Sequence, residues 1–289
     1  MSPSKIPQKV AIISHPMITE AVAESELVAG YLQQRGIDVS TGNLDDHALN
    51  MDLRTGHFDL AIVLGGDGTI LRAGHMCIVS KTPILGINYG RFGFLMEIER
   101  KNWRDYLLRL LEGDYRTEER MLLVTEHWRK TEKLDSWVVL NESVVCRGQL
   151  VRPLHLDAYV DGHFLTTYVA DGLLAATPTG STAYALAAGG PIMPPELRNI
   201  LLIPVAPHLS VDRAIILSQG ARVSIEVMSD HPAVLSVDGH APITIEKHDR
   251  VDSFASEQNL QFVRFQNAGY FYRTLMSHMD QNPSTGISR

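Results

Sequence analysis

Cysteine is scarce in this chain, which has two, Cys77 and Cys146, in 289 residues. Neither belongs to a CxxC motif or to a Cys/His spacing that would hold a metal. The scarcity excludes a disulfide-stapled secreted fold and favours a reducing compartment. The pattern indicates two structural thiols rather than a catalytic one.

Long apolar runs and an excess of positive charge are also missing. Residues 200–203 (Ile-Leu-Leu-Ile) are among the longest apolar runs, far short of the roughly 20 residues that cross a bilayer. Residues 1–8 lack the apolar segment of a signal peptide. The formal net charge of -7 argues against a nucleic-acid partner. We therefore expect a soluble cytoplasmic protein with neither a membrane nor a nucleic-acid partner.

The first half of the chain alternates short apolar runs with segments that carry a helical stripe. Gly36 follows the first of these segments, where a helix C-terminal glycine belongs. This alternation predicts an α/β domain with a doubly wound, mostly parallel sheet. The expected strands are residues 9–14, 37–39, 59–64 and 83–87, and the expected helices are residues 18–35, 69–80 and 102–111.

From about Met121 the pattern changes to closely spaced β-type runs, which predict a mostly-β second domain. Asp161-Gly162 is a hairpin signal, and the alanine-rich segment 180–190 indicates a short helix. The expected strands are residues 121–127, 137–146, 154–160, 163–169, 172–177, 200–206, 222–228, 234–238, 242–246 and 261–265.

These patterns place the α/β domain over residues 1–118 and the mostly-β domain over residues 119–266. We expect residues 267–289 to pack back on the first domain or to be disordered. The polar tail 281–289 contains proline and glycine, which favours disorder.

The expected strand 59–64 runs into the loop Gly65-Gly66-Asp67-Gly68-Thr69 and then a helix. Backbone amides of such a loop can approach a phosphate, and the helix N-terminus adds a favourable dipole. The spacing is neither that of a P-loop nor that of the dinucleotide fingerprint.

Asp67 is the unusual residue of this loop, because a carboxylate repels phosphates. It suits a base for a hydroxyl nucleophile, or a contact to a ribose hydroxyl or Mg²⁺. The alternative is a tight turn in which Asp67 caps the following helix.

A second polar segment, residues 177–184 (Thr-Pro-Thr-Gly-Ser-Thr-Ala-Tyr), is dense in hydroxyl groups. Thr179, Ser181 and Thr182 can offer donors near a helix N-terminus, which suits a phosphate or a ribose. A capped helix start, with Thr179 or Ser181 as the cap, explains the segment equally well.

Four segments occur in one order: residues 65–69, residues 88–95 (NYGRFGFL), Asn141-Glu142, and residues 171–192 (DGLLAATPTGSTAYALAAGGPI). Together they closely resemble the NAD kinase family over residues 9–270. The GGDGT motif alone is weak evidence for this family, since diacylglycerol and sphingosine kinases share it. The combination of TPTGSTAY with AGGP and an upstream Asn-Glu is specific to the NAD kinase family.

NAD kinases transfer a phosphoryl group to the 2′-hydroxyl of the adenosine ribose of NAD, so the resemblance implies an enzyme that produces NADP. It implies ATP as the γ-phosphoryl donor, with polyphosphate used by some members, and Mg²⁺ as the divalent cofactor. It assigns nucleotide phosphates to the first domain and NAD to the second. It also implies a homodimer or homotetramer.

The resemblance also assigns roles to residues. Asp67 would accept the proton of the 2′-hydroxyl, and Gly68 with its loop would cradle phosphate. Arg72 would face the nucleotide phosphates, its alternative being a solvated helix residue. Asn141 and Glu142 resemble the pair that contacts adenine and ribose; if buried, they need hydrogen-bond partners. Their alternative is a satisfied turn at a strand end.

Other positions match the family less directly. Asp171 resembles the carboxylate near the nicotinamide end, and Arg152 aligns with a polar or basic position that approaches the nucleotide. Four further residues match the family's segment around the bound nucleotide: Thr182, Ala183, Tyr184 and Ala187.

The chain departs from the family at three positions. Val169 stands where arginine is common, Ala187 where serine is common, and His240 where many members have glutamine. His240 can donate a hydrogen bond in place of that glutamine, so we include it among the binding residues. These departures bear on the choice between NAD and NADH and on inhibition by product.

Two other functions fit part of the pattern. A lipid kinase would share GGDGT and a two-domain plan, but it would not explain TPTGSTAY or Asn141-Glu142. A non-catalytic NAD sensor would use Asn141, Glu142 and Thr182 for binding, but the intact loop around Asp67 argues against lost catalysis.

Overall fold

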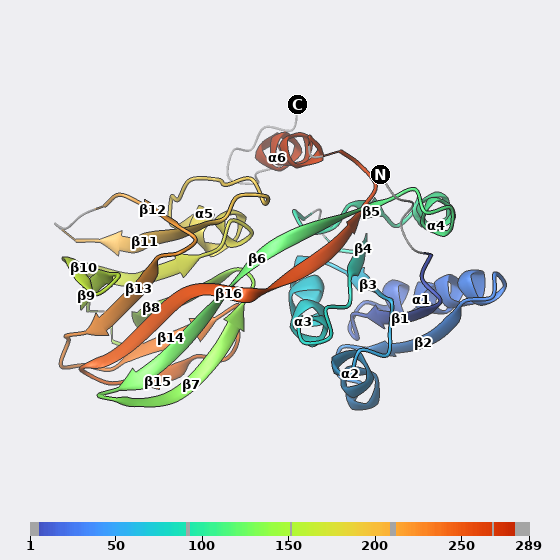
Figure 1. Cartoon of the computed structure of the whole chain (residues 1–289). Helices are drawn as coiled ribbons and strands as arrows, with labels where there is room; N and C mark the ends of the chain where they lie inside the picture. Colours follow the sequence, from blue (N-terminus) through green and yellow to red (C-terminus); the bar gives the residue numbers. More distant parts are fainter. Residues whose placement is uncertain (1–5, 91–92, 151, 209–211, 268, 281–289) are drawn as a thin grey trace. The chain divides into compact units, whose positions relative to one another are not determined.

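The computed structural model describes residues 6–90, 93–150, 152–208, 212–267 and 269–280, and Figure 1 traces its elements in chain order. These residues form two compact units. One holds the described residues of Met1–Glu119 and Leu260–Arg289, and the other holds those of Arg120–Asn259. The tail 281–289, for which disorder is predicted, lies outside the described residues.

The first unit contains a parallel sheet with the strand order β2-β1-β3-β4. β5 pairs with β4, and the end of β16 (Asp249–Arg264) runs parallel to β4, with Phe262 opposite Ile84. The strands are β1 (Lys9–Ser14), β2 (Asp38–Asn43), β3 (Leu60–Gly65), β4 (Ile84–Asn88) and β5 (Ile98–Glu99). The helices are α1 (Thr19–Gln33), α2 (His47–Arg54), α3 (Asp67–Cys77), α4 (Trp103–Leu111) and α6 (Tyr270–Asp280).

Helices cover both faces of this sheet. Leu85 of β4 shares a buried cluster with Val28 of α1 and Leu107 of α4. Gly86, the next residue, faces the other way, because successive strand residues point to opposite faces. A Cβ on Gly86 would lie 2.9 Å from Cδ1 of Ile70 on α3. The predicted doubly wound α/β architecture is therefore confirmed.

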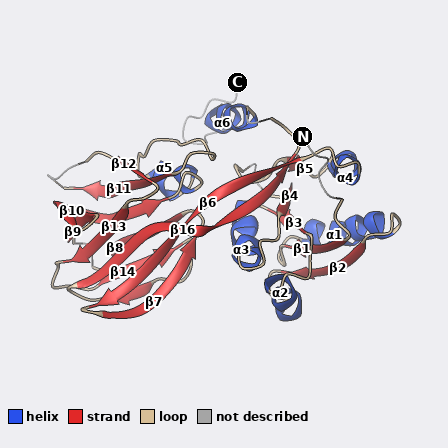
Figure 2. Ribbon diagram, viewed as in Figure 1, coloured by secondary structure: helices blue, strands red, loops and turns tan. Residues whose placement is uncertain are grey.

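The second unit is mostly β-sheet, as predicted (Figure 2). Its main path of antiparallel neighbours is β15-β14-β8-β10-β9-β13-β16, while β11 pairs with β10 and β12, and β6 pairs with β7. The remaining strands are β6 (Arg116–Arg129), β7 (Glu132–Val139), β8 (Glu142–Arg147), β9 (Leu154–Val160), β10 (His163–Ala176), β11 (Asn199–Pro207), β12 (Ile215–Ser218), β13 (Arg222–Val227), β14 (Ala233–Val237) and β15 (Ile243–Ile245). A 3-10 turn, η1 (Gly180–Thr182), and a short helix, α5 (Tyr184–Ala187), interrupt the β pattern.

Two turns confirm specific sequence signals. Asp161 and Gly162 have φ angles of 52° and 78°, as the tight hairpin between β9 and β10 requires. Gly36 has a φ angle of 82° just beyond α1, the left-handed conformation that glycine adopts after a helix.

Some predicted elements were wrong in detail. Residues 137–146 form two strands, β7 and β8, with a break between them, whereas 163–169 and 172–177 form the single strand β10. The helices α2 and α6, the strand β12 and most of β16 were not predicted. Within the described part of the chain, no helix combines the length and the apolar character needed to cross a membrane.

Candidate active site

The glycine loop lies at the carboxyl end of β3, where the chain enters α3. Gly66 occupies the position before the helix, and its amide donates a hydrogen bond to the Thr69 hydroxyl at 3.1 Å. Asp67 is the first residue of the helix proper. The helix is therefore capped by Gly66 together with Thr69, and the alternative in which Asp67 is the cap is wrong.

The Asp67 carboxylate instead reaches a second loop of the same unit. Oδ2 accepts a hydrogen bond from the Phe94 amide at 2.8 Å, and Oδ1 accepts one from the Leu95 amide at 3.2 Å. A Cβ on Gly93 would lie 2.0 Å from Oδ1 of Asp67. Amide donors stabilise an ionised carboxylate and hold it in one orientation. The half-buried Asp67 is thus a fixed, charged group at the mouth of the loop.

The segment after β4 fits against the glycine loop along its backbone. The Tyr89 amide donates to the Gly65 carbonyl at 2.7 Å. A Cβ on Gly90 would lie 3.3 Å from Cα of Gly66. This close approach explains the glycine spacing of residues 88–95, of which residues 91 and 92 lie outside the described part of the structure.

Gly68 and Arg72 follow Asp67 on α3. Gly68 is exposed, and a Cβ there would meet no atom within 4 Å, so the helix N-terminus is open on this side. Arg72 is half exposed and donates to Oδ1 of Asp45 at 2.9 Å. In this structure the Arg72 guanidinium is engaged by a neighbouring carboxylate, whereas Gly68 leaves room for an anion.

In the second unit, Asn141 and Glu142 lie where β7 ends and β8 begins. The Asp238 carboxylate accepts hydrogen bonds from the amides of Leu140, Asn141 and Glu142 at 2.7, 2.8 and 3.0 Å. On the other side, Thr177 donates its amide to the Asn141 carbonyl at 2.9 Å and its hydroxyl to the Leu140 carbonyl at 2.6 Å. The break between the strands is therefore held from two directions.

Glu142 is buried, and its Oε2 atom has no hydrogen-bond partner among the described residues. Burial and the neighbouring charge of Asp238 raise the pKa of Glu142 from 4.5 to about 7, while a hydrogen bond from the Tyr184 backbone acts in the opposite direction. A buried polar atom without a partner costs free energy, so this oxygen is suited to a ligand.

The raised pKa of Glu142 gives a testable pH dependence of stability. Between about pH 4.5 and pH 7 the folded protein keeps a proton that the unfolded chain has released. The stabilisation is full below the unfolded pKa and is lost as the pH rises through the folded pKa. We expect the free energy of unfolding of wild-type protein, relative to Glu142→Gln, to fall by on the order of 3 kcal/mol from about pH 5 to about pH 8. Urea titrations of both proteins across this range measure the gap, and a gap independent of pH would refute the assignment.

The hydroxyl groups of the second polar segment bond largely to the backbone around them. Ser181 donates to the Pro178 carbonyl at 2.6 Å, and Thr182 donates to the Thr179 carbonyl at 3.1 Å. Neither Thr179 nor Ser181 caps the helix start: Thr179 precedes η1 without a side-chain cap bond, and the Gly180 amide donates to the Thr177 hydroxyl at 3.0 Å instead. The half-exposed Thr182 is the member of this set that remains accessible to a ligand.

Gly180 packs directly on the Asn141 backbone. A Cβ on Gly180 would lie 2.1 Å from the Asn141 carbonyl oxygen, so alanine forces the two segments apart. We expect Gly180→Ala to lower the free energy of unfolding by about 1–3 kcal/mol. Gly220→Ala is the matched control, because a Cβ there meets nothing within 4 Å. Equal unfolding free energies for the two variants in urea titrations would contradict this packing.

Several of the other predicted residues of this unit lie near Tyr184. Burial is the main cause that raises the pKa of the Tyr184 phenol. The charges of Asp171 and Glu142 raise this pKa further, and the charge of Arg147 lowers it. Asp171 pairs with Nε of Arg147 at 3.0 Å. Ala183 directly precedes α5 and Ala187 ends it. Arg152 is exposed.

His240 closes the turn after β14, where its amide donates to the Val237 carbonyl at 2.8 Å. The same turn contains Asp238, so the structure brings this turn to Asn141 and Glu142. Sequence reasoning did not select Asp238 or Arg147 as site residues. The Asp-Gly pair at residues 238–239 is visible in the sequence, but a tight turn is enough to explain it, so it did not indicate a binding site.

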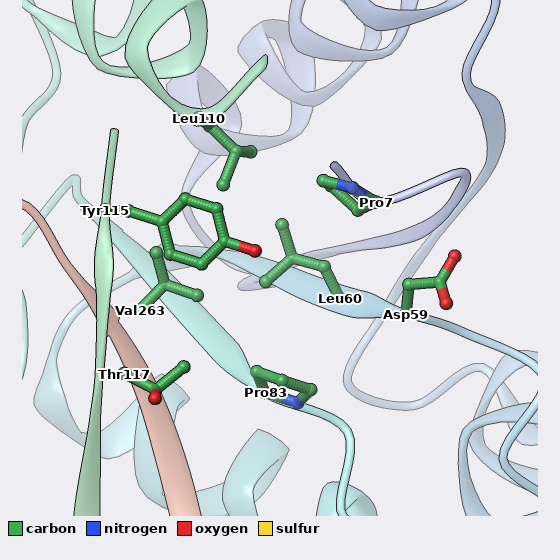
Figure 3. Close-up of a pocket in the computed structure, with 8 residues that line it drawn as sticks. All are labelled: Pro7, Asp59, Leu60, Pro83, Leu110, Tyr115, Thr117 and Val263. Carbon is green, nitrogen blue, oxygen red and sulfur yellow. The ribbon is translucent and has the colours of Figure 1, made fainter. Parts of the chain in front are cut away.

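A separate cavity of about 200 Å³ lies in the first unit (Figure 3). Leu60 opens β3 and Pro83 precedes β4, so this cavity is at the amino ends of these strands, opposite the glycine loop. Ligands of open α/β sheets bind at the carboxyl ends. The cavity includes none of the predicted site residues; it is lined by Pro7, Asp59, Leu60, Pro83, Leu110, Tyr115, Thr117 and Val263.

The chain is similar to known proteins over most of its length. The family model described as ATP-NAD kinase N-terminal domain matches residues 22–115, and the one described as ATP-NAD kinase C-terminal domain matches residues 140–265. The NAD kinase of Chloroflexus aurantiacus is 35% identical over 272 residues, which cover 94% of this chain and 98% of that protein.

Two solved structures share the fold. The yeast NADH kinase complexed with NADH superposes with a TM-score of 0.82 at 24% identity, covering 99% of this chain and 91% of that chain. An NAD kinase from Archaeoglobus fulgidus in complex with ATP superposes with a TM-score of 0.74 at 24% identity, covering 93% of this chain and 97% of that chain.

Proposed function

This chain belongs to the NAD kinase family, and we propose that it transfers the γ-phosphoryl group of ATP to the 2′-hydroxyl of the adenosine ribose of NAD, producing NADP. The observation that carries this proposal is the Asp67 carboxylate. It stands in a glycine loop at a helix start, yet it is turned away from the capping position and fixed by the amides of Phe94 and Leu95.

Asp67 acts as the general base in this proposal. It accepts the proton of the ribose hydroxyl as that oxygen attacks the γ-phosphorus, while the bond from the γ-phosphorus to the bridging oxygen of ADP breaks. Positioned bases of this kind contribute about 10²–10⁴-fold to rate. Two amide donors orient the carboxylate, and this supports the role because orientation is a large part of enzymatic rate acceleration.

The open N-terminus of α3 binds phosphate in this proposal. The amide of the exposed Gly68 and the helix dipole attract the anion, and Arg72 adds positive charge once it leaves Asp45. Mg²⁺ is held by one or two carboxylates together with substrate phosphates. When bound to the nucleotide phosphates, Mg²⁺ would neutralise charge on the transferring phosphoryl group.

The second unit binds NAD. Glu142 supports this assignment, because its buried Oε2 atom has no partner among the described residues and a ribose hydroxyl would supply one. Asp171 serves the nicotinamide end. The other proposed contacts are Asn141, Arg152, Thr182, Ala183, Tyr184, Ala187 and His240.

The proposal is tested by NADP formation in the presence of Mg²⁺. NAD and NADH are offered as acceptors, and ATP and polyphosphate as donors, in all four combinations. We expect product with NAD and ATP. No product in any combination would overturn the proposal, and phosphorylation of a diacylglycerol instead would favour a lipid kinase. NAD binding without turnover would favour a sensor.

We also propose a cytoplasmic homodimer or homotetramer, as the family resemblance implies. Light scattering coupled to size-exclusion chromatography measures the assembly directly, against a chain mass of 32.1 kDa. A mass equal to one chain at micromolar concentration would contradict it.

A further inference from the structure

Asp238 occupies the turn between β14 and β15. Its backbone conformation is that of an ordinary turn residue, but its side chain is not placed as a turn would require. Its φ angle is 48° and that of Gly239 is 72°, which an Asp-Gly turn alone explains. Its side chain, however, is buried and leaves the turn to reach the start of β8. The comparable turn residue Asp161, with φ of 52°, accepts one amide, that of Arg222 at 2.8 Å.

The Asp238 carboxylate gathers three consecutive amides. Leu140, Asn141 and Glu142 all donate to it within 3.0 Å, and the Asp238 amide donates back to the Glu142 carbonyl at 2.9 Å. Charge-assisted hydrogen bonds of this kind are about twice as strong as neutral ones. Without the carboxylate all three amides would lose this partner, and Leu140 and Asn141 lie at the break between β7 and β8, outside both strands.

We propose that Asp238 is a positioning residue for the dinucleotide site, fixing the backbone that presents Asn141 and Glu142 to NAD. The inference rests on the proposed function, since it presumes that this pair binds the substrate. Asp238 itself acts through the three amides. On the opposite side Thr177 holds the Leu140 and Asn141 carbonyls, so that removing Asp238 releases one of two tethers.

Asp238 also sets the charge around Glu142. The groups that face the Glu142 carboxyl are Asp238 from the β14–β15 turn and the Tyr184 amide from α5, of opposite effect on its pKa. Around Tyr184 lie Asp171 of β10 and Arg147 of β8. Neutralising Asp238 therefore lowers the pKa of Glu142 and moves its titration to lower pH. Exposure of Glu142 to solvent would lower this pKa as well, so a variant that keeps the charge, Asp238→Glu, is needed to separate the two effects.

Asp238→Asn tests the inference, with Asp161→Asn as the matched control. Asparagine tolerates the left-handed backbone at both positions and removes the same charge. We expect Asp238→Asn to raise the KM for NAD roughly tenfold or more, to leave the KM for ATP unchanged, and to change kcat less than the KM for NAD. The inflection in the pH profile of the KM for NAD shifts to lower pH in this variant and stays in place in Asp161→Asn.

A second variant separates position from charge. Asp238→Glu keeps the charge but displaces the carboxylate by one methylene, so the KM for NAD rises while the pH inflection is largely retained; it also serves if Asp238→Asn does not fold. Active wild-type protein with Asp238 variants that match Asp161→Asn in both readouts would overturn the inference. Inactive wild-type protein would instead overturn the proposed function.

Discussion

The Asp67→Asn variant is expected to form NADP about 10²–10⁴-fold more slowly than wild-type protein at saturating NAD and ATP. An amide cannot accept the proton of the ribose hydroxyl, whereas its shape is close to that of the carboxylate. One of the two backbone donors, Phe94 or Leu95, will face an NH₂ group, so a small loss of stability accompanies the loss of rate. Steady-state kinetics with thermal unfolding of the same samples separates the two effects.

Asp46→Asn is the matched control for this variant. Asp46 lies in the same unit, and its Oδ1 accepts hydrogen bonds from the amides of Ala48 and Leu49 at 3.0 and 3.1 Å at the start of α2. The same exchange there removes an equivalent charge bonded to two amides, and asparagine caps helices well. We expect nearly wild-type turnover from Asp46→Asn. Near wild-type turnover from Asp67→Asn would remove Asp67 from the role of base.

The Arg264→Met variant is expected to lose about 3–5 kcal/mol of stability. Arg264 lies at the end of β16 and is fully buried. Its Nη1 donates to the Leu95 carbonyl at 2.9 Å, and its Nε lies 3.4 Å from the Glu118 carboxylate, which also accepts from the Tyr270 hydroxyl at 3.3 Å. Methionine fills similar space but removes the Arg264 charge from the buried Glu118, which keeps Arg116 at 3.1 Å, and it leaves the Leu95 carbonyl without its Arg264 donor.

We also expect activity to fall in Arg264→Met. The Leu95 carbonyl loses its donor in this variant, and the Leu95 amide is one of the two that orient Asp67. Arg35→Met is the control: Arg35 is exposed and donates to the Tyr31 carbonyl at 3.0 Å, and such surface contacts contribute little. Urea unfolding at 25 °C measures both variants. A loss below about 1 kcal/mol for Arg264→Met would show that the buried charge is not a significant source of stability.

Sequence reasoning predicted most of the first unit, because its strands are short, apolar and separated by helical stripes. Residues 9–14 form β1 as predicted. The helix α2 was missed because it is only eight residues long and its buried side is limited to Leu49 and Leu53. The Asp46 cap was the signal that could have found it.

The second unit was harder to predict, because contacts distant in sequence decide its breaks. WVVLNESVV looks like one strand, but Asp238 and Thr177 hold Leu140 and Asn141 out of the ladder. Asp171-Gly172 looks like a turn, yet Gly172 lies inside β10. A Cβ there would lie 2.8 Å from the Val145 carbonyl oxygen, so this glycine serves close strand packing.

In the candidate site, too, local sequence features could be predicted, whereas contacts between residues distant in sequence could not. Asp67 could be selected from the sequence, because a carboxylate in a glycine loop is unusual. Its hydrogen-bond partners could not, since Phe94 and Leu95 are more than twenty residues away and carry no polar side chain. Asp238 was overlooked because a local turn accounts for it fully until the amides of residues 140–142 are seen around it.

The position of the transferred phosphate is the most direct test of the role proposed for Asp67. Wild-type protein is incubated with NAD, ATP and Mg²⁺, and the product is examined by ³¹P NMR alongside the Asp67→Asn and Asp46→Asn variants. We expect a phosphomonoester on the 2′-oxygen of the adenosine ribose from wild-type protein and Asp46→Asn, and almost none from Asp67→Asn. A phosphate at another position, or equal yields from all three proteins, would contradict Asp67 as the base for the 2′-hydroxyl.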